Sequence, residues 1–333
     1  MSGSNSTSFE VWSKIWLYVI FIAQGTVMSS LNLLAVAAIC YQQALNERKE
    51  YILIAGKALA DGLFGAAYLI GGSHFTIMVL TGWNRAPIDL FKCFFMPHTL
   101  LWTISTPGFC LMNLVLSADR LFSVSDPLLY YSTGRNYAIT VVSVSLAVCV
   151  CLGLGIPVLV SLVNGAYEKK VSRMCGPVGT LSAIHPWVIS LYKDPGMFFL
   201  ISSGLLCIPI ICMYSKNSKM AVGTNRDVKR QQKQQRRLTK SLLISAMSTM
   251  LVHVLPARLA YPLSTWGYGK LSMWMFILSN IDPVLNALIL YKRQPELRKA
   301  IAALLHCNQL APNLNQWQIS VNTNSIGPTT NGI

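Results

Sequence analysis

Hydrophobic residues form seven long runs along this chain, and short polar segments separate them. The runs cover positions 15–41, 51–80, 91–122, 137–163, 186–214, 240–264 and 270–291. A helix needs about 20 mainly apolar residues to cross the hydrocarbon core of a bilayer, and each run is long enough. The pattern therefore predicts an all-α integral membrane protein in which residues 15–291 form a bundle of seven transmembrane helices.

A shorter amphipathic segment follows the last run. Its apolar residues recur at helical spacing, with basic residues beside them: Leu297, Ile301, Leu304 and Leu305. Such a helix lies along the membrane surface instead of crossing it. We expect residues 292–307 to form this juxtamembrane helix at the inner membrane face. Residues 308–333 are rich in Asn, Gln, Ser and Thr, and we expect a disordered cytoplasmic tail.

The distribution of basic residues predicts the orientation of the bundle. With the N-terminus outside, two thirds of the 27 Lys and Arg residues fall on the inner side, Lys57 included as an inner helix end. Basic residues favour the cytoplasmic side of a membrane. Residues 1–14 are then an extracellular N-terminus, and their Asn5-Ser6-Thr7 triplet makes Asn5 an expected glycosylation site.

Composition fits a membrane protein as well. Hydrophobic residues make up 53% of the chain and charged residues 12%, against about 25% charged in a soluble domain. The net charge of +15 is attributed to surfaces that face anionic lipid or an intracellular partner, not to nucleic-acid binding. Residues 215–239 carry much of it and are expected to continue the fifth and sixth helices. This segment is either a solvated, lipid-attracted face or a partner-docking surface, and the two are compatible.

The chain offers little of the chemistry that enzymes need. It contains no glycine-rich phosphate loop, no zinc-ligand spacing and no plausible nucleophile triad, so we expect no enzyme, cofactor or metal. No internal repeat is visible, which disfavours an inverted-repeat transporter. A small transporter or ion channel that uses Asp61 and Asp282 is the main alternative function.

Three of the nine cysteines differ from the rest. Six lie within the apolar runs and are expected to behave as small hydrophobic residues. Cys93 and Cys175 lie on the expected outer side, where disulfides persist. Cys307 follows the amphipathic segment just inside the membrane, where palmitoylation is plausible.

Short motifs inside the runs carry a family resemblance. They are Asn32, Leu59-Ala60-Asp61, Asp119-Arg120-Leu121, Pro209, Pro256 and Asp282-Pro283-Val284-Leu285-Asn286. In them the chain resembles rhodopsin-like (class A) G-protein-coupled receptors, and it is most similar to nematode serpentine chemoreceptors of the Srsx-like group. The resemblance covers all seven runs and the helix after them. Leu121 and Asn286 each replace the tyrosine of the family pattern.

The resemblance implies a receptor in the plasma membrane. Such a receptor senses an extracellular chemosensory or small-peptide ligand and activates a heterotrimeric G protein by rearranging its helices. The resemblance also implies a disulfide between Cys93 and Cys175.

Arg120 is the residue to which the resemblance gives the clearest role. Asp119 is expected to hold it at rest and to release it toward the G protein on activation. The alternative is that Arg120 only reaches out to lipid headgroups. Many relatives hold this arginine with an acid on the sixth helix, whereas Arg236 and Arg237 occupy that region here and would repel it. Appreciable activity without ligand is therefore expected.

Asp61 and Asp282 are carboxylates at membrane depth. Charge is costly there, so both side chains should face the bundle interior or water. If they approach each other, as the family geometry implies, both are not easily ionised together. They either share a proton, hold a cation together with Asn32, or belong to a static hydrogen-bond network.

The outer half of the bundle suggests a ligand site. Arg258 lies in the outer half of the sixth run, and Arg pairs well with carboxylates or phosphates. Aromatic walls for a pocket are available from His98, Trp102, Tyr261 and Trp274. We expect a small anionic or acidic-peptide ligand, with the alternative that Arg258 merely reaches the outer interface.

Overall fold

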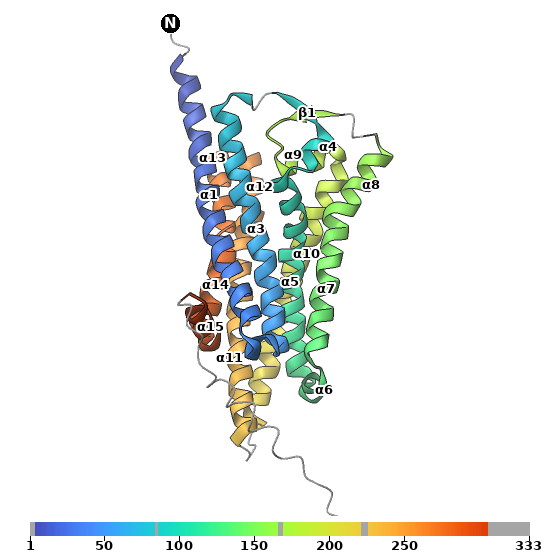
Figure 1. Ribbon diagram of the computed structural model, residues 1–333, viewed down its shortest axis with the longest axis vertical. Coiled ribbons are helices and arrows are strands. Elements are labelled where there is room, and N and C mark those ends of the chain that lie inside the picture. The colour runs from blue at the N-terminus through green and yellow to red at the C-terminus, as the bar shows by residue number, and fades with distance from the viewer. Residues whose placement is uncertain (1–3, 84–85, 166–168, 221–225, 306–333) are drawn as a thin grey trace, which may run out of the picture.

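The computed structural model describes residues 4–83, 86–165, 169–220 and 226–305 (Figure 1). Seven of the described helices are long and apolar enough to cross a membrane. They cover Ile15–Tyr41, Lys49–Leu80, Pro97–Ser125, Arg135–Val163, Gly196–Met213, Arg237–Ala260 and Gly269–Arg293. The predicted seven-helix bundle is therefore confirmed. The predicted tail, 308–333, and Cys307 lie outside the described residues.

Several of the spans are composed of more than one helical element. In chain order the elements are α1 (Ser4–Tyr41), α2 (Gln43–Asn46), α3 (Lys49–Leu80), β1 (Pro87–Asp89), α4 (Leu90–Phe94), α5 (Pro97–Ser125), α6 (Pro127–Ser132), α7 (Arg135–Val150), the π-helical turn η2 (Cys151–Gly155), α8 (Ile156–Val163), β2 (Lys170–Ser172), α9 (Pro177–Ile184), α10 (Pro186–Met220), α11 (Arg226–Ser248), the π-helical turn η4 (Thr249–Val254), α12 (Leu255–Thr265), α13 (Gly269–Ser279), α14 (Asp282–Arg293) and α15 (Pro295–Leu305).

The first two spans, α1 and α3, run side by side because glycines let their backbones meet (Figure 1). A Cβ atom on Gly25 would lie 2.4 Å from the backbone nitrogen of Leu69. One on Gly65 would lie 2.6 Å from the backbone nitrogen of Ser29. Small residues serve this purpose in membrane helices, whose packing relies on close van der Waals contact.

The third span begins later than the apolar run suggested. The run starts at position 91, but residues 90–94 form the separate helix α4, and α5 begins at Pro97. Proline is favourable in the first turn of a helix, since the backbone N–H that it lacks has no partner there. Pro97 therefore starts this helix.

The elements β1, β2, α4 and α9 cover the end of the bundle at which the N-terminus lies (Figure 1). The two strands pair antiparallel, with Ile88 opposite Val171. A disulfide joins Cys93 on α4 to Cys175 in the segment after β2, so the expected bridge is present. The carbonyl of Cys175 also accepts a hydrogen bond from the Thr99 hydroxyl at 2.9 Å, which fixes this segment to the top of α5.

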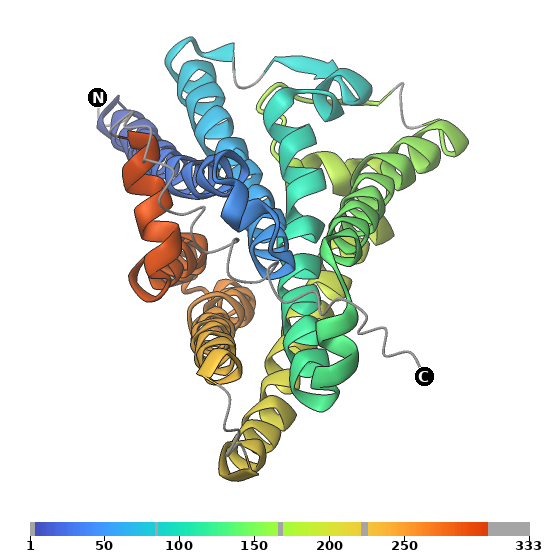
Figure 2. The same ribbon diagram turned by 60° about the horizontal axis from the view of Figure 1, so that its bottom comes forward.

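The end of the bundle opposite the N-terminus carries the helix extensions expected from the sequence. α10 continues to Met220 and α11 begins at Arg226, so both helices reach into the basic segment 215–239. Figure 2 brings this end forward and shows α15 beside α1 and α6 against the end of α5. On α15, Leu297 and Ile301 are buried, so the amphipathic helix packs one face on the bundle.

Candidate functional site

Arg120 is almost fully buried, with 1% of its surface exposed, near the C-terminal end of α5. Its Nε donates a hydrogen bond to Asp119 Oδ2 at 3.0 Å, and a terminal nitrogen contacts the same oxygen. That nitrogen also donates to the hydroxyl of Tyr130 at 2.7 Å. Arg120 therefore points into the protein and not toward lipid headgroups. Its charge is compensated by Asp119, as a buried charge requires.

Tyr130, which the sequence analysis did not single out, completes this cluster from the short helix α6. Its hydroxyl donates to Asp119 Oδ2 at 3.3 Å, and its side chain is buried. Burial is the largest influence on the Tyr130 hydroxyl and raises its pKa, so it stays protonated and able to donate. We call Asp119, Arg120 and Tyr130 the inner cluster.

Lys49 holds α6 in place from the start of α3. Its ammonium lies 3.6 Å from the centre of the Tyr130 ring. It also contacts the Tyr130 carbonyl and donates to the carbonyl and hydroxyl oxygens of Thr133 at 3.0 and 2.9 Å. A cation over an aromatic ring is attracted by the ring's negative face. The inner cluster is therefore closed by a helix that is itself fastened to α3.

A small cavity lies beside Arg120, between α5, α10 and α11. Its walls are Asn113, Leu116, Ser117, Arg120, Cys207, Ile210, Leu242, Leu243, Ser245 and Ala246. Ser117 and Ser203 join α5 to α10 through a 2.7 Å hydrogen bond at the same level. Of the other predicted switch residues, Leu121 is partly exposed and Arg237 exposed. The side chain of Arg236 lies outside the described residues.

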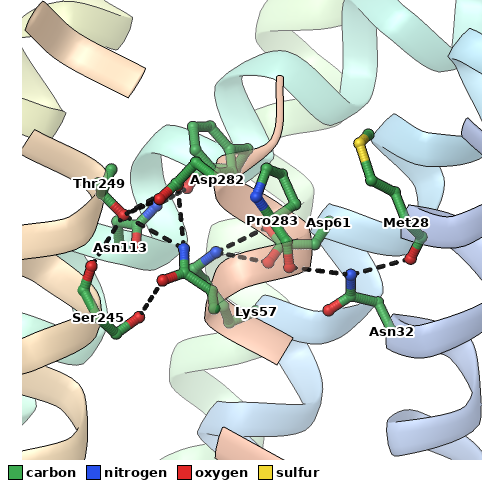
Figure 3. Close-up of polar contacts among 11 residues, drawn as sticks. Met28, Asn32, Lys57, Asp61, Asn113, Ser245, Thr249, Asp282 and Pro283 are labelled. Carbon is green, nitrogen blue, oxygen red and sulfur yellow. Dashed lines mark hydrogen bonds and ion pairs between the residues drawn. The ribbon is translucent and has the colours of Figure 1, made fainter. Parts of the chain in front are cut away.

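A second ion pair lies in the centre of the bundle. The Lys57 ammonium donates to both carboxylate oxygens of Asp61, at 2.7 and 2.6 Å (Figure 3). Both side chains are buried, with 4% and 2% of their surface exposed. The prediction that Lys57 lies at the inner helix end is wrong. α3 begins at Lys49, so more than two helical turns precede Lys57 and carry it into the interior.

Asp282 belongs to a hydrogen-bond network between α14 and the sixth span (Figure 3). Its oxygens accept from the Thr249 hydroxyl at 2.9 and 3.1 Å and from Asn286 Nδ2 at 3.0 Å. The Asn286 carbonyl in turn accepts from the Ser245 hydroxyl at 2.6 Å. Asn286, which replaces the family's tyrosine, therefore fastens α14 to α11.

Asn32 fastens α1 to α14. Its Nδ2 donates to the carbonyl of Met28 at 2.9 Å and to that of Pro283 at 3.5 Å (Figure 3). The sequence analysis considered a cation held by Asn32, Asp61 and Asp282 together. In the structure the positive charge beside Asp61 belongs to the chain itself, and Asn32 is bonded to backbone carbonyls.

The residues expected around a ligand are only partly brought together. His98 is buried, with its Nε2 3.1 Å from the carbonyl of Cys175, and Trp102 is partly buried one turn below it on α5. Arg258 and Trp274 are exposed, which agrees with the alternative that Arg258 reaches the outer interface. The side chain of Tyr261 lies outside the described residues. Within the described part of the chain, no three His, Cys, Asp or Glu side chains are grouped as metal ligands.

Comparison with protein families bears on the same residues. Residues 11–155 match the family model described as serpentine type 7TM GPCR chemoreceptor Srbc. The chain is similar to serpentine chemoreceptors. The matched part runs from the first span into the fourth, contains Asn32, Asp61, Asp119 and Arg120, and confirms the expected resemblance. The match is to the Srbc model, so the Srsx-like subgroup is not confirmed. No curated protein matches the chain.

Proposed function

We propose that this chain is a G-protein-coupled receptor of the plasma membrane, with its N-terminus outside, that senses an extracellular small molecule or short peptide. The carrying observation is the inner cluster: a buried arginine beside a cavity that three cytoplasmic helix ends surround. An arginine held in this way is available to an intracellular partner only after the surrounding helices separate. The cluster is therefore the closed form of a docking site for a heterotrimeric G protein.

Opening requires α11 to move away from α5 and Tyr130 to release Arg120. The chain provides a hinge for this movement in the sixth span. Pro256 lacks a backbone N–H, and the π-helical turn η4 lies directly before it, spanning Thr249–Val254. π-helical turns within α-helices are frequent at functional sites. A swing about η4 carries the inner end of α11 outward and leaves α12 on the outer side in place.

The same hinge joins the outer and inner halves. Thr249 is the first residue of η4, and its hydroxyl binds Asp282 at the start of α14. A ligand that shifts the sixth or seventh span on the outer side therefore acts on the bonds that hold α11. It needs a higher affinity for the open form than for the closed form, since only this difference shifts the population.

The basic extensions of α10 and α11 form the remainder of the proposed docking surface. They carry much of the net charge of +15 and meet both anionic lipid and the intracellular partner. For the ligand we propose an anionic group that pairs with Arg258 in the sixth span. The exposure of Arg258 fits equally the alternative that this side chain reaches the outer interface.

The transporter or channel alternative has less support. It needs Asp61 and Asp282 to be free for a moving ion, but Asp61 is paired with Lys57 and Asp282 accepts hydrogen bonds from Thr249 and Asn286. Both carboxylates are thus committed to protein partners. Ion flux through reconstituted vesicles would favour this alternative again.

The proposed function is tested by recruitment of a panel of engineered G-protein subunits to the surface-expressed chain without added ligand. Arg120→Ala is compared with wild type at matched surface levels, and Lys270→Ala, an exposed basic residue on the outer side, is the control. Recruitment by wild type and Lys270→Ala that is lost in Arg120→Ala supports the proposal. Equal recruitment by all three argues that Arg120 has no part in coupling.

A further inference from the structure

We propose that the Lys57 ammonium is a tethered counter-ion at the centre of the bundle: it neutralises Asp61 permanently and keeps free monovalent cations out of the site between Asp61 and Asp282. The physical claim concerns cation binding and stability, and it holds or fails by itself.

The first argument is charge. Lys57, Asp61 and Asp282 expose 3%, 1% and 0% of their surface, so water does not screen them. An isolated buried charge is very costly, and it is retained when it is paired and hydrogen-bonded. Asp61 receives the ammonium on both oxygens, while Asp282 receives neutral donors from Thr249 and Asn286. The cation of this site is therefore already supplied by the chain.

The second argument is position. Lys57 and Asp61 are four residues apart on α3, so one helical turn holds the ammonium next to the carboxylate. The ring of Phe109 on α5 covers the ammonium from the other side, with its centre 4.8 Å away. Figure 3 shows Asp282 in the same group of polar side chains as Lys57 and Asp61. A sodium ion that approached either acid would meet this fixed positive charge at short range and be repelled.

The test uses the purified full chain in detergent, with no G protein present. Thermal unfolding is followed with a thiol-reactive dye, because Cys110, Cys149 and Cys207 are buried and become reactive on unfolding. Each variant is measured in sodium chloride and in choline chloride of equal concentration. The variants are Lys57→Met, Asp61→Asn and the double variant, with Lys92→Met, an exposed outer lysine, as the control.

Wild type and Lys92→Met are expected to unfold at the same temperature in both salts. Lys57→Met leaves a buried carboxylate without its partner and should unfold roughly 10 °C lower in choline. Sodium should restore part of this loss, because the ion can now enter. The double variant removes both charges, so it should recover most of the loss and show no difference between the salts.

Two results would overturn the proposal. One is a wild-type protein that sodium stabilises and choline does not, since the site would then take a free ion despite Lys57. The other is a double variant no more stable than Lys57→Met, which would show that the two charges are not coupled. If Lys57→Met fails to fold, recovery in the double variant decides the question alone. None of these outcomes depends on G-protein recruitment. A failure of the Lys57 proposal can therefore be told apart from a failure of the proposed receptor function.

Discussion

The protein contains two buried ion pairs, and they differ in what surrounds them. Lys57 and Asp61 lie on one helix, one turn apart, under the ring of Phe109. Arg120 and Asp119 are neighbours in sequence and depend on Tyr130 from a separate short helix. A cavity lies beside Arg120. Burial alone therefore does not make a switch. A buried ion pair can act as a switch when a separate helix that can move away covers it and a cavity beside it leaves space for the released side chain.

The two ion pairs are therefore expected to have different roles. The central pair can persist in every state of the bundle, because nothing in its surroundings has to move, and removing one partner alone leaves a buried charge uncompensated. The inner pair is stable only while α6 and α11 remain closed over it. Substitutions should therefore affect stability at the centre and signalling at the inner end.

The largest effect is expected at the central pair. Asp61→Ala leaves the Lys57 ammonium buried without a partner, which costs about 3–5 kcal/mol of stability. Surface expression should fall severely. Lys57→Met in the same chain should restore much of it, measured by labelling an N-terminal epitope on intact cells. Surface expression of Asp61→Ala equal to wild type would show that the pair of Lys57 and Asp61 has no structural role.

Arg120→Ala should have the opposite effect to Asp61→Ala: it should lower G-protein recruitment strongly and surface expression only moderately. Arg120 itself lines a cavity, so its truncation opens further space in which water can solvate the Asp119 carboxylate. The folded chain should therefore reach the surface at more than roughly half the wild-type level. G-protein recruitment should fall at least roughly tenfold, because the contact to the partner is lost. A severe loss of folding in Arg120→Ala would instead make the two pairs equivalent.

Asn286 links the two regions and should show an intermediate effect. Asn286→Leu removes the hydrogen bonds to Ser245, Thr249 and Asp282 and keeps the branching of the side chain at Cγ. Each lost bond to a buried group costs about 1–3 kcal/mol, so the fastening of α14 to α11 should weaken. We expect higher recruitment without ligand together with a moderate fall in unfolding temperature. Recruitment equal to wild type would show that this network does not restrain α11.

The smallest effect is expected from an exposed ion pair on the outer surface. Asp89 binds Lys170 and Lys92, and these hydrogen bonds lower its pKa to about 2. The stabilising contribution of a carboxylate with a lowered pKa is complete above its ordinary pKa and is lost as pH falls through the lowered value. Asp89 should therefore add no pH dependence between about pH 5 and 8. Asp89→Asn should leave the unfolding temperature nearly unchanged at neutral pH, since exposed pairs contribute little.

The spans were predictable because a membrane imposes one rule on every helix that crosses it. The buried pair of Asp119 and Arg120 was singled out by its motif, and its role as a switch stays a prediction. Tyr130 was not, because its role depends on α6 folding back against α5, which no local pattern indicates. Lys57 was misplaced because the apolar run at 51–80 hides where α3 begins, and the helix start decides how deep a lysine lies.

The most direct test of the account is G-protein recruitment by Tyr130→Phe without ligand, at matched surface levels. This change removes the hydroxyl that binds Arg120 and Asp119 but keeps the ring under Lys49. A hydrogen bond to a charged group contributes about 1.5–3 kcal/mol, so recruitment should rise roughly tenfold above wild type where the closed form predominates. The double variant with Arg120→Ala should abolish the rise. Recruitment by Tyr130→Phe at or below the wild-type level would contradict the claim that Tyr130 holds the receptor closed.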